Sequence, residues 1–452
     1  MKIIIAGSGK AGLTLARELG EEGHDLTMID MDRELMTSIQ NELDVMGVVG
    51  NCASMPTLQD AGVESADLVI AATNADEVNL LSCLTAHGLN PKVHTIARVR
   101  NPEYTDQIYA MRQMFALSMT VNPHKQAATE IRRLMQFPGF LRRDTFAKGK
   151  TEIVELRVEK GSKLCDVSLI DLYKIIKCQV LVCTVLRDGK AFTPRGNFVL
   201  REGDRIFVTA PTKSLAVLLR NLGIINRKVR DVILCGADRI SRYLAQMLLK
   251  DGIHVKIIDK DPIRCQELGE QLEGVDVVCG DCSSKSFLLE QGIKEYDTVV
   301  ALTNIDETNM VISLYAKALG VPQIITKLGR SENMDMADDL ELGSVICPVE
   351  LCGNNIVRYV RAMQKQTGAA VSVHTIADGR AEASEFLVTE GTVNCGKPLK
   401  ELKLKSGVLV ASITRGAVTE IPNGNSAFQV GDTVVAVTTG KEVLHQLSDI
   451  FA

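Results

Sequence analysis

The chain has 452 residues, enough for about three or four domains, and with 46% hydrophobic and 24% charged residues it has the composition of a folded globular protein. Its formal net charge of −5 and its scattered Lys and Arg residues exclude a general nucleic-acid-binding surface. No apolar run approaches the ~18 residues of a membrane span, and strand-like sequence begins at residue 2. We therefore expect a cytosolic protein whose cysteines are reduced thiols.

Residues 3–98 alternate short β-branched runs with helical patterns. The expected strands are 3–6, 25–30, 47–49, 67–72 and 93–98, and the expected helices are about 11–20, 33–43, 55–61 and 77–87. This alternation predicts an α/β fold in which a doubly wound parallel sheet is covered by helices on both faces. The strands are nearly continuous apolar runs, as in "LVIAAT", which is typical of buried parallel strands.

The sequence pattern changes after this predicted domain. "NPHKQAATEIRRLMQFPGF" predicts a connector helix that ends near Pro138-Gly139. Beyond it, about 150–220, short alternating strands are separated by the turn sequences "RDGK", "PRGN" and "REGD". This pattern predicts a small α+β domain, rich in strands and with one or two helices.

The whole arrangement then repeats. Gly7 aligns with Gly236 at an offset of 229 residues, and Thr73 aligns with Thr303 at an offset of 230. The chain is therefore a tandem duplication of one two-domain unit. The expected divisions are a doubly wound domain, a connector helix and a small domain at 1–123, 124–144 and 145–225, then at 228–347, 348–368 and 369–452.

The segment "GSGKAG" follows a strand and opens a helix, which is the context that a dinucleotide-binding GxGxxG motif requires. The first glycine permits the tight turn, the second lets the backbone approach a pyrophosphate, and the third lets the helix pack on the strand. The helix N-terminus offers free N–H groups and a partial positive charge. The candidate phosphate-binding residues are Gly7, Ser8, Gly9, Lys10, Ala11 and Gly12.

Further candidates lie at the ends of later strands. Asp30 is placed to accept both ribose hydroxyls and would repel a 2′-phosphate, which disfavours NADP. Lys10 suits a terminal phosphate, so ATP or ADP stays open beside NAD. Thr73 and Asn74 end the fourth strand over the crevice. Arg98 ends the fifth, either as a donor to phosphate or ribose or as a surface ion-pair partner.

The second unit has an eroded loop. In "GADRIS", residues 236–241, the second and third glycines are lost, and Asp238 places a carboxylate where a pyrophosphate would approach. The other positions of the crevice persist as Asp259, Thr303, Asn304 and Lys327. We expect a structural copy with a weakened or altered nucleotide site.

The sequence shows no catalytic constellation. The seven histidines form no His/Asp or Ser/His/Asp pattern, and there is no nucleophile elbow or zinc-ligand spacing. One Cys-x-x-Cys, Cys279 to Cys282, has only Cys52 at the matching place in the first unit, which favours ordinary thiols over a metal site. We expect a nucleotide sensor that is not an enzyme; the alternative is a soluble NAD-dependent oxidoreductase.

A family resemblance supports this interpretation. The segments that carry it are "GSGKAG…MIDMD", "VVGNCA", "VIAATNADEVNLLSC", "IARVRNPEY", "RRLMQFPG", the second "VALTNIDETNM" and the repeated "PxGN…GD". Over essentially its full length the chain resembles the TrkA family, the peripheral regulatory subunits of Trk-type bacterial potassium uptake systems, which contain tandem RCK/KTN units.

The resemblance implies Rossmann-like domains that bind NAD(H), with ATP or ADP competing for the same crevice. It adds Asn51 and Cys52 to the candidate nucleotide residues. It also implies a homo-oligomer, a dimer or a tetramer ring, on the cytoplasmic face of the cell membrane. There the ring would gate a Trk-type potassium-translocating membrane subunit. Some relatives bind a cyclic dinucleotide in the small domains, but no residue here supports that assignment.

Overall fold

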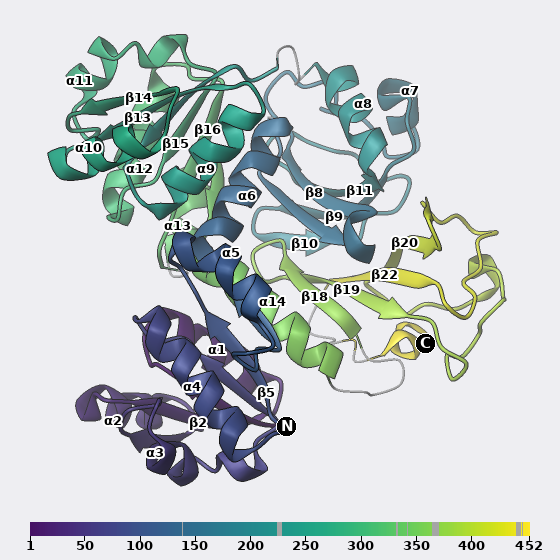
Figure 1. Ribbon diagram of the computed structural model, residues 1–452. Helices are drawn as coiled ribbons and strands as arrows, with labels where there is room; N and C mark the ends of the chain where they lie inside the picture. Colours follow the sequence, from purple (N-terminus) through teal and green to yellow (C-terminus); the bar gives the residue numbers. More distant parts are fainter. Residues whose placement is uncertain are drawn as a thin grey trace.

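The computed structural model describes residues 1–137, 139–223, 228–330, 333–340, 342–363, 370–439, 444 and 446–452. These residues form four sheets, in which parallel six-stranded sheets alternate along the chain with five-stranded antiparallel ones (Figure 1). The predicted fold class and tandem duplication are confirmed. The expected helix end at Pro138 and the expected connector residues 364–368 lie outside the described residues.

The first parallel sheet has the order β3-β2-β1-β4-β5-β6. Its strands are β1 (Lys2–Ala6), β2 (Asp25–Asp30), β3 (Met46–Val49), β4 (Leu68–Ala71), β5 (His94–Arg98) and β6 (Met119–Val121). Its helices are α1 (Lys10–Glu21), α2 (Arg33–Glu42), α3 (Met55–Asp60), α4 (Asp76–Leu89) and α5 (Pro102–Met111). The strand order reverses between β1 and β4, and the loops after these strands therefore open a crevice at the carboxyl edge.

The second parallel sheet repeats this order as β14-β13-β12-β15-β16-β17. Its strands are β12 (Asp231–Cys235), β13 (His254–Asp259), β14 (Val275–Cys279), β15 (Thr298–Ala301), β16 (Gln323–Lys327) and β17 (Ser344–Ile346). Its helices are α9 (Arg239–Lys250), α10 (Pro262–Gln271), α11 (Lys285–Glu290), α12 (Asp306–Ala318) and α13 (Met334–Asp339).

The two antiparallel sheets pack against each other. The first contains β7 (Arg142–Phe146), β8 (Thr151–Arg157), β9 (Leu181–Arg187), β10 (Lys190–Phe192) and β11 (Arg205–Pro211), with α7 (Leu172–Ile176) and α8 (Thr212–Leu222). The second contains β18 (Ala370–Ile376), β19 (Ala381–Leu387), β20 (Val408–Arg415), β21 (Val418–Glu420) and β22 (Thr433–Thr439). Phe146 and Phe207 of the first sheet share one apolar core with Ile376 and Val435 of the second.

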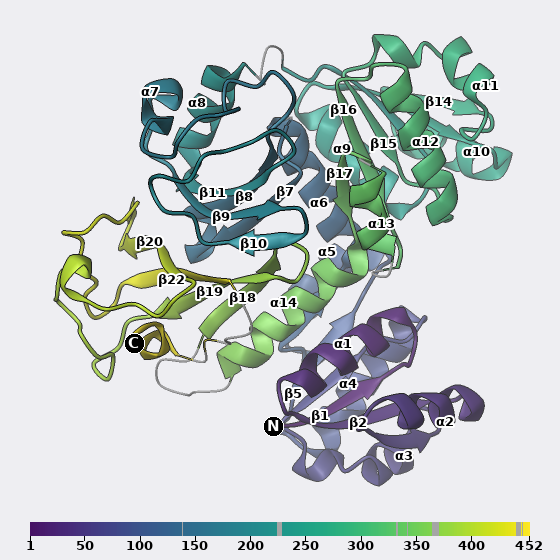
Figure 2. The ribbon, with the colours of Figure 1, turned by 180° about the vertical axis from the view of Figure 1, so that it is seen from behind.

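Two connector helices cross between the units. The apolar face of α6 (Pro123–Gln136), with Ile131 and Leu134, is buried in the core of the second parallel domain beside α9. Conversely, α14 (Pro348–Met363) buries Ile356 and Val360 in the core of the first parallel domain beside α1 (Figure 2). A fully buried aliphatic side chain contributes about 1.5–3 kcal/mol. Each unit therefore completes the core of the other.

Polar contacts fix where each connector lies. Arg132 of α6 binds Asp251 through two hydrogen bonds of 2.5 and 2.6 Å. Arg361 of α14 donates from Nε to Glu22 at 2.8 Å. These pairs join elements more than a hundred residues apart in the chain, and they set the register of each helix on its partner domain.

Candidate nucleotide site

The glycine loop between β1 and α1 has three distinct positions. Gly7 has φ +104°, and a Cβ there would lie 2.9 Å from the backbone nitrogen of Thr73. A Cβ on Gly12 would lie 1.9 Å from the carbonyl oxygen of Gly7. A Cβ on Gly9 would meet nothing within 4 Å. Gly7 and Gly12 are therefore required by packing, whereas Gly9 leaves backbone open to an approaching ligand.

The N-terminus of α1 is open to an anion. Gly9 is its N-cap, no described side chain caps the helix there, and its first turn has no acidic residue. The leading N–H groups of a helix have no partner within the helix, and the helix dipole adds a partial positive charge. The geometry fits the phosphates of a nucleotide, whose charge these groups would balance.

Asp30 stands at the end of β2, beside the loop. Its Oδ2 accepts hydrogen bonds from the backbone nitrogen and Oγ of Ser8, at 2.7 and 2.5 Å, and its Oδ1 accepts from the backbone nitrogen of Asp32 at 3.0 Å. Burial by itself would raise the pKa of Asp30, but these hydrogen bonds outweigh it and hold the pKa below its ordinary value. The carboxylate is thus fixed and charged, as an acceptor for ribose hydroxyls must be.

Asn79 ties together the ends of β4 and β5. Its Oδ1 accepts from the backbone nitrogen and Oγ1 of Thr73 at 2.8 and 2.7 Å, and its Nδ2 donates to the carbonyl oxygen of Arg98 at 2.8 Å. Asn79 is fully buried. Asn309 makes the same bonds to Thr303 and Lys327 in the second unit. The asparagine at this position therefore sets the geometry of the crevice in each unit.

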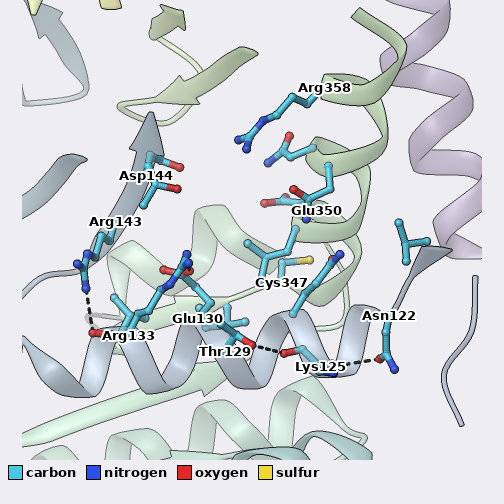
Figure 3. Close-up of a pocket in the computed structure, with 18 of the residues that line it drawn as sticks. Asn122, Lys125, Thr129, Glu130, Arg133, Arg143, Asp144, Cys347, Glu350 and Arg358 are labelled. Carbon is cyan, nitrogen blue, oxygen red and sulfur yellow. Dashed lines mark hydrogen bonds and ion pairs between the residues drawn. The ribbon is translucent and has the colours of Figure 1, made fainter. Parts of the chain in front are cut away.

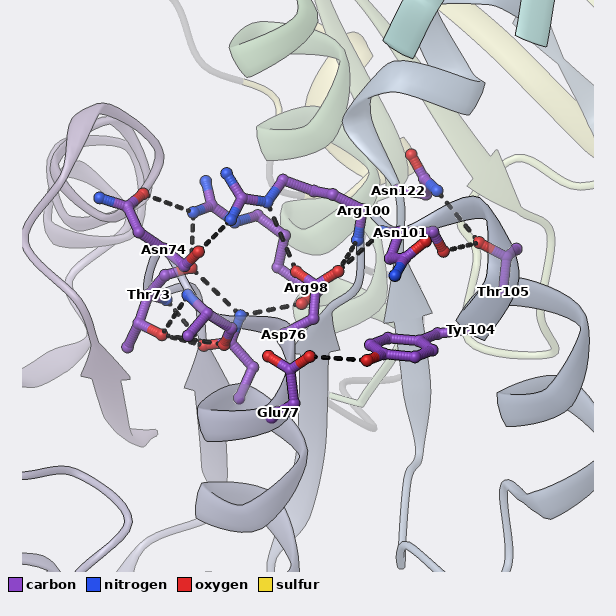
Figure 4. Close-up of polar contacts among 12 residues, drawn as sticks. Thr73, Asn74, Asp76, Glu77, Arg98, Arg100, Asn101, Tyr104, Thr105 and Asn122 are labelled. Atoms are coloured by element: carbon purple, nitrogen blue, oxygen red, sulfur yellow. Dashed lines mark hydrogen bonds and ion pairs between the residues drawn. The ribbon is translucent and has the colours of Figure 1, made fainter. Parts of the chain in front are cut away.

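Arg98 crosses the crevice (Figure 4). Its Nη2 donates to the carbonyl oxygen of Thr73 at 2.6 Å and to Oδ1 of Asn74 at 3.3 Å. Its Nε is buried and has no hydrogen-bond partner among the described residues. Burial lowers the pKa of Arg98 to about 10, which leaves the side chain charged near neutral pH. A cation with an unused donor fits a ligand that brings acceptor oxygens.

A second arginine, which was not predicted from the sequence, lies at this edge. The backbone nitrogens of Arg100 and Asn101 each donate to Oδ2 of Asp76 at 2.7 Å, and Nε of Arg100 lies 3.4 Å from Oδ1 of Asp76. Arg100 also donates from Nη2 to the carbonyl oxygen of Asn74. The repeated segments "TNADEVN" and "TNIDETN" place Asp76 and Asn79 at matching positions in both units, so the repeat could have indicated these two residues but not Arg100.

The remaining candidates, Asn51 and Cys52, differ in their exposure. Asn51 follows β3 and is exposed, and its side chain accepts from the backbone nitrogen of Ala53 at 3.0 Å. Cys52 is buried against α4, where Ser82 donates to its sulfur at 3.2 Å. Burial raises the pKa of the Cys52 thiol. Asn51 is placed beside the Asp30 end of the crevice, whereas Cys52 packs beneath it.

Lys10 extends toward the second unit. Its Nζ lies 3.8 Å from the place that a Cβ of Gly329 would take, in the loop whose backbone Asp306 holds through a 2.8 Å hydrogen bond from Gly329. A phosphate bound at the open helix terminus would thus lie at the boundary between the two parallel domains.

The second crevice contains its own charge pair. Asp238 caps α9 by accepting from the backbone nitrogen of Ser241 at 2.9 Å, and its Oδ2 lies 2.6 Å from Nζ of the buried Lys327. Ser241 is accommodated at the position equivalent to Gly12 because its Oγ donates a hydrogen bond to the carbonyl oxygen of Gly236 at 2.5 Å. Asp259 still accepts from the backbone nitrogen of Ala237 at 2.7 Å. Thr303 and Asn304 keep their places after β15.

Fold and site together define a duplicated chain in which doubly wound, Rossmann-like domains alternate with small antiparallel domains. Comparison with protein families matches residues 3–121 and 232–348 to the TrkA-N domain, and residues 153–223 and 383–452 to the TrkA-C domain. The chain belongs to the TrkA family. The predicted family resemblance is confirmed.

Relatives and solved structures agree with this assignment. The Trk system potassium uptake protein TrkA homolog of Archaeoglobus fulgidus is 34% identical, with 100% of both chains covered. The TrkA protein of Halomonas elongata is 30% identical, over 100% of this chain and 98% of its own. A solved structure titled "GsuK channel bound to NAD" has a TM-score of 0.61 at 19% identity, covering 97% of this chain and 76% of that one. Among the described helices, none is both long and apolar enough to cross a bilayer.

Proposed function

We propose that this protein is the regulatory subunit of a Trk-type potassium uptake system, and that it binds NAD(H), ATP or ADP in its first parallel domain. The open N-terminus of α1, with Asp30 on one side and Arg98 on the other, carries this proposal. Membership of a family whose curated relatives are potassium uptake proteins supports the transport role.

The proposed mechanism follows from linkage. A ligand shifts a conformational equilibrium only by binding one state better than another, commonly by about 1–3 kcal/mol. Phosphates at Gly9 and Lys10 would lie against the loop of the second unit that contains Gly329. The bound nucleotide would therefore bias the angle between the two parallel domains, and a membrane pore subunit on the cytoplasmic side would respond to that angle. We propose a homo-oligomeric ring as the assembled state.

Potassium flux tests this proposal. The chain is reconstituted in vesicles with the Trk-type membrane subunit of its own organism, and rubidium uptake is measured with and without NAD, NADH, ATP and ADP. We expect nucleotide-dependent uptake in the wild type and in Asp259→Ala, and its loss in Asp30→Ala, which removes the ribose acceptor but leaves α1 intact. Unchanged nucleotide dependence in Asp30→Ala would refute the assigned site. Turnover of NADH with a 2-oxo acid would instead favour an oxidoreductase.

A further inference from the structure

A cavity of about 810 Å³ lies between the two connector helices (Figure 3). Its walls come from α6, from β7 and from α14, so both units contribute to it. The glycine loop, Asp30 and Arg98 are not among its lining residues. The cavity is large enough for a small-molecule ligand.

The cavity lining is rich in cations. Its charged side chains are Lys125, Arg133, Arg142, Arg143 and Arg358 against Glu130, Asp144 and Glu350. Asp144 is already neutralised, because its carboxylate lies 3.1 Å from Nε of Arg142 and 2.9 Å from Nδ1 of His374. Burial raises the pKa of Glu130 to about 7, so part of its negative charge is lost near neutral pH.

The contact between His374 and Arg358 shows which cation is free. Nη2 of Arg358 lies 2.7 Å from Nε2 of His374. An arginine only donates, so Nε2 must accept, and the imidazole proton must lie on Nδ1, from which it is donated to Asp144. Among the described residues, no carboxylate lies within ion-pair distance of Arg358, so its charge is not compensated by an ion pair. The Nε of Arg358 is also buried without a partner among the described residues.

The opposite wall of the cavity supplies further cations. The side chain of Arg133 on α6 is 46% exposed, and among the described residues its ion-pair partner is Glu130, at 3.4 Å. Arg143 is committed to Glu152 through a 2.7 Å hydrogen bond. Lys125 lies about two helical turns before Arg133 on the same helix. Figure 3 shows Arg358 on one side of the cavity and Arg133 with Lys125 on the other.

We propose that this cavity binds a small molecule carrying a pyrophosphate or similar pair of phosphate groups, held between Arg358 of α14 and Arg133 of α6. Guanidinium groups on two walls match a ligand with anionic oxygens at both ends, and phosphate oxygens fit the guanidinium fork. Such a ligand would bridge the two connector helices, α6 and α14, and would stabilise one arrangement of the two units. Binding at this cavity does not require binding at the nucleotide crevice.

Calorimetric titration of the full chain with inorganic pyrophosphate tests this site. The first crevice is blocked by Gly9→Asp, the residue that the second unit carries; the change fits because a Cβ on Gly9 meets nothing within 4 Å. We expect pyrophosphate to bind the Gly9→Asp chain with unchanged affinity for the cavity. Adding Arg358→Gln or Arg133→Gln to that chain should raise the Kd at least about tenfold.

The controls separate this proposal from the proposed nucleotide function. Arg264 on α10 is 48% exposed, and the variant Arg264→Gln should leave the Kd for pyrophosphate unchanged. Arg133 is half exposed, so its variant folds even if Arg358→Gln does not. Loss of pyrophosphate binding in Gly9→Asp, or binding unaffected by both cavity variants, would overturn the proposal while leaving the crevice assignment standing. Equal affinity for citrate would overturn the choice of phosphate.

Discussion

At the scale of single residues, the two crevices differ by a few side chains with large consequences. In the first, Gly9 leaves the helix terminus uncapped. In the second, Asp238 caps the helix and pairs with Lys327 at 2.6 Å. Because the carboxylate already satisfies both the helix terminus and the lysine, a pyrophosphate there would have to displace it from a partly buried pair. Asp238 in place of Gly9, together with Lys327 in place of Arg98, thus separates a crevice with an open helix terminus from one with an internal charge pair.

Glu18 is a residue whose charge opposes the fold. It lies on α1 against α14, where a Cβ of Gly353 would be 3.0 Å from its Oε2, and that oxygen is buried without a partner among the described residues. Burial, with the nearby carboxylates of Glu350 and Glu22, raises the pKa of Glu18 to about 7. The folded state thus holds this proton more tightly than the unfolded chain. Stability falls as the pH rises from about 4.5 to 7, and the loss is complete above 7.

The variant Glu18→Gln should remove this pH dependence. We expect its free energy of unfolding to exceed that of the wild type by about 1–2 kcal/mol at pH 8, and to match it at pH 5. Urea denaturation at both pH values measures the difference. Glu42→Gln on α2, where the carboxylate is 60% exposed, is the control and should change neither. Equal stabilisation at both pH values would show that Glu18 does not titrate as described.

At the scale of elements, the connector helices hold the two units together. α6 has an apolar face that is covered by the second parallel domain, and the first parallel domain has a face that is covered by α14. A fragment of residues 1–223 exposes both surfaces. Since the two units are copies of one pattern, two such fragments can cover each other by exchanging α6.

We therefore expect the 1–223 fragment to form a stable homodimer, because dimerisation buries Ile131 and Leu134 as the full chain does. Size-exclusion chromatography with light scattering measures its mass at micromolar concentration. Ile131→Asp in the same fragment should abolish the dimer, whereas Thr129→Asp at a partly exposed position of the helix should not. A monomeric wild-type fragment would contradict the role given to the connectors.

Much of the first domain was predictable from its sequence. The expected strand at 25–30 has the same bounds as β2, and the expected helix at 33–43 differs from α2 by one residue. Buried parallel strands have continuous apolar runs that end sharply at polar residues, so their bounds are readable. β6 was not predicted, because three residues carry no periodicity. The apolar face of α6 predicts that the helix is buried, but not which domain covers it.

The candidate site was partly predictable for a similar reason. Asp30 is identified by its place after a strand, since the carboxyl ends of parallel strands share one edge. The Asp238–Lys327 pair joins residues 89 positions apart, and no local pattern announces it. Likewise, Arg98 was predictable as a candidate, but its bond to the carbonyl oxygen of Thr73 depends on the register of neighbouring strands.

At the scale of the whole molecule, the duplication places in one chain a crevice with an uncapped helix terminus and a crevice with an internal charge pair. The connector helices and the shared core of the antiparallel sheets join the four domains. We propose that this asymmetry gives the chain one nucleotide site, because two identical units would respond to nucleotide in the same way.

Calorimetric titration of the full chain with NAD, NADH, ATP and ADP tests this claim most directly. We predict one nucleotide site per chain, whose affinity falls at least about tenfold in Asp30→Ala and is unchanged in Asp259→Ala. Circular dichroism of both variants checks that the fold is retained. Two sites per chain, or a single site lost in Asp259→Ala and kept in Asp30→Ala, would contradict the account.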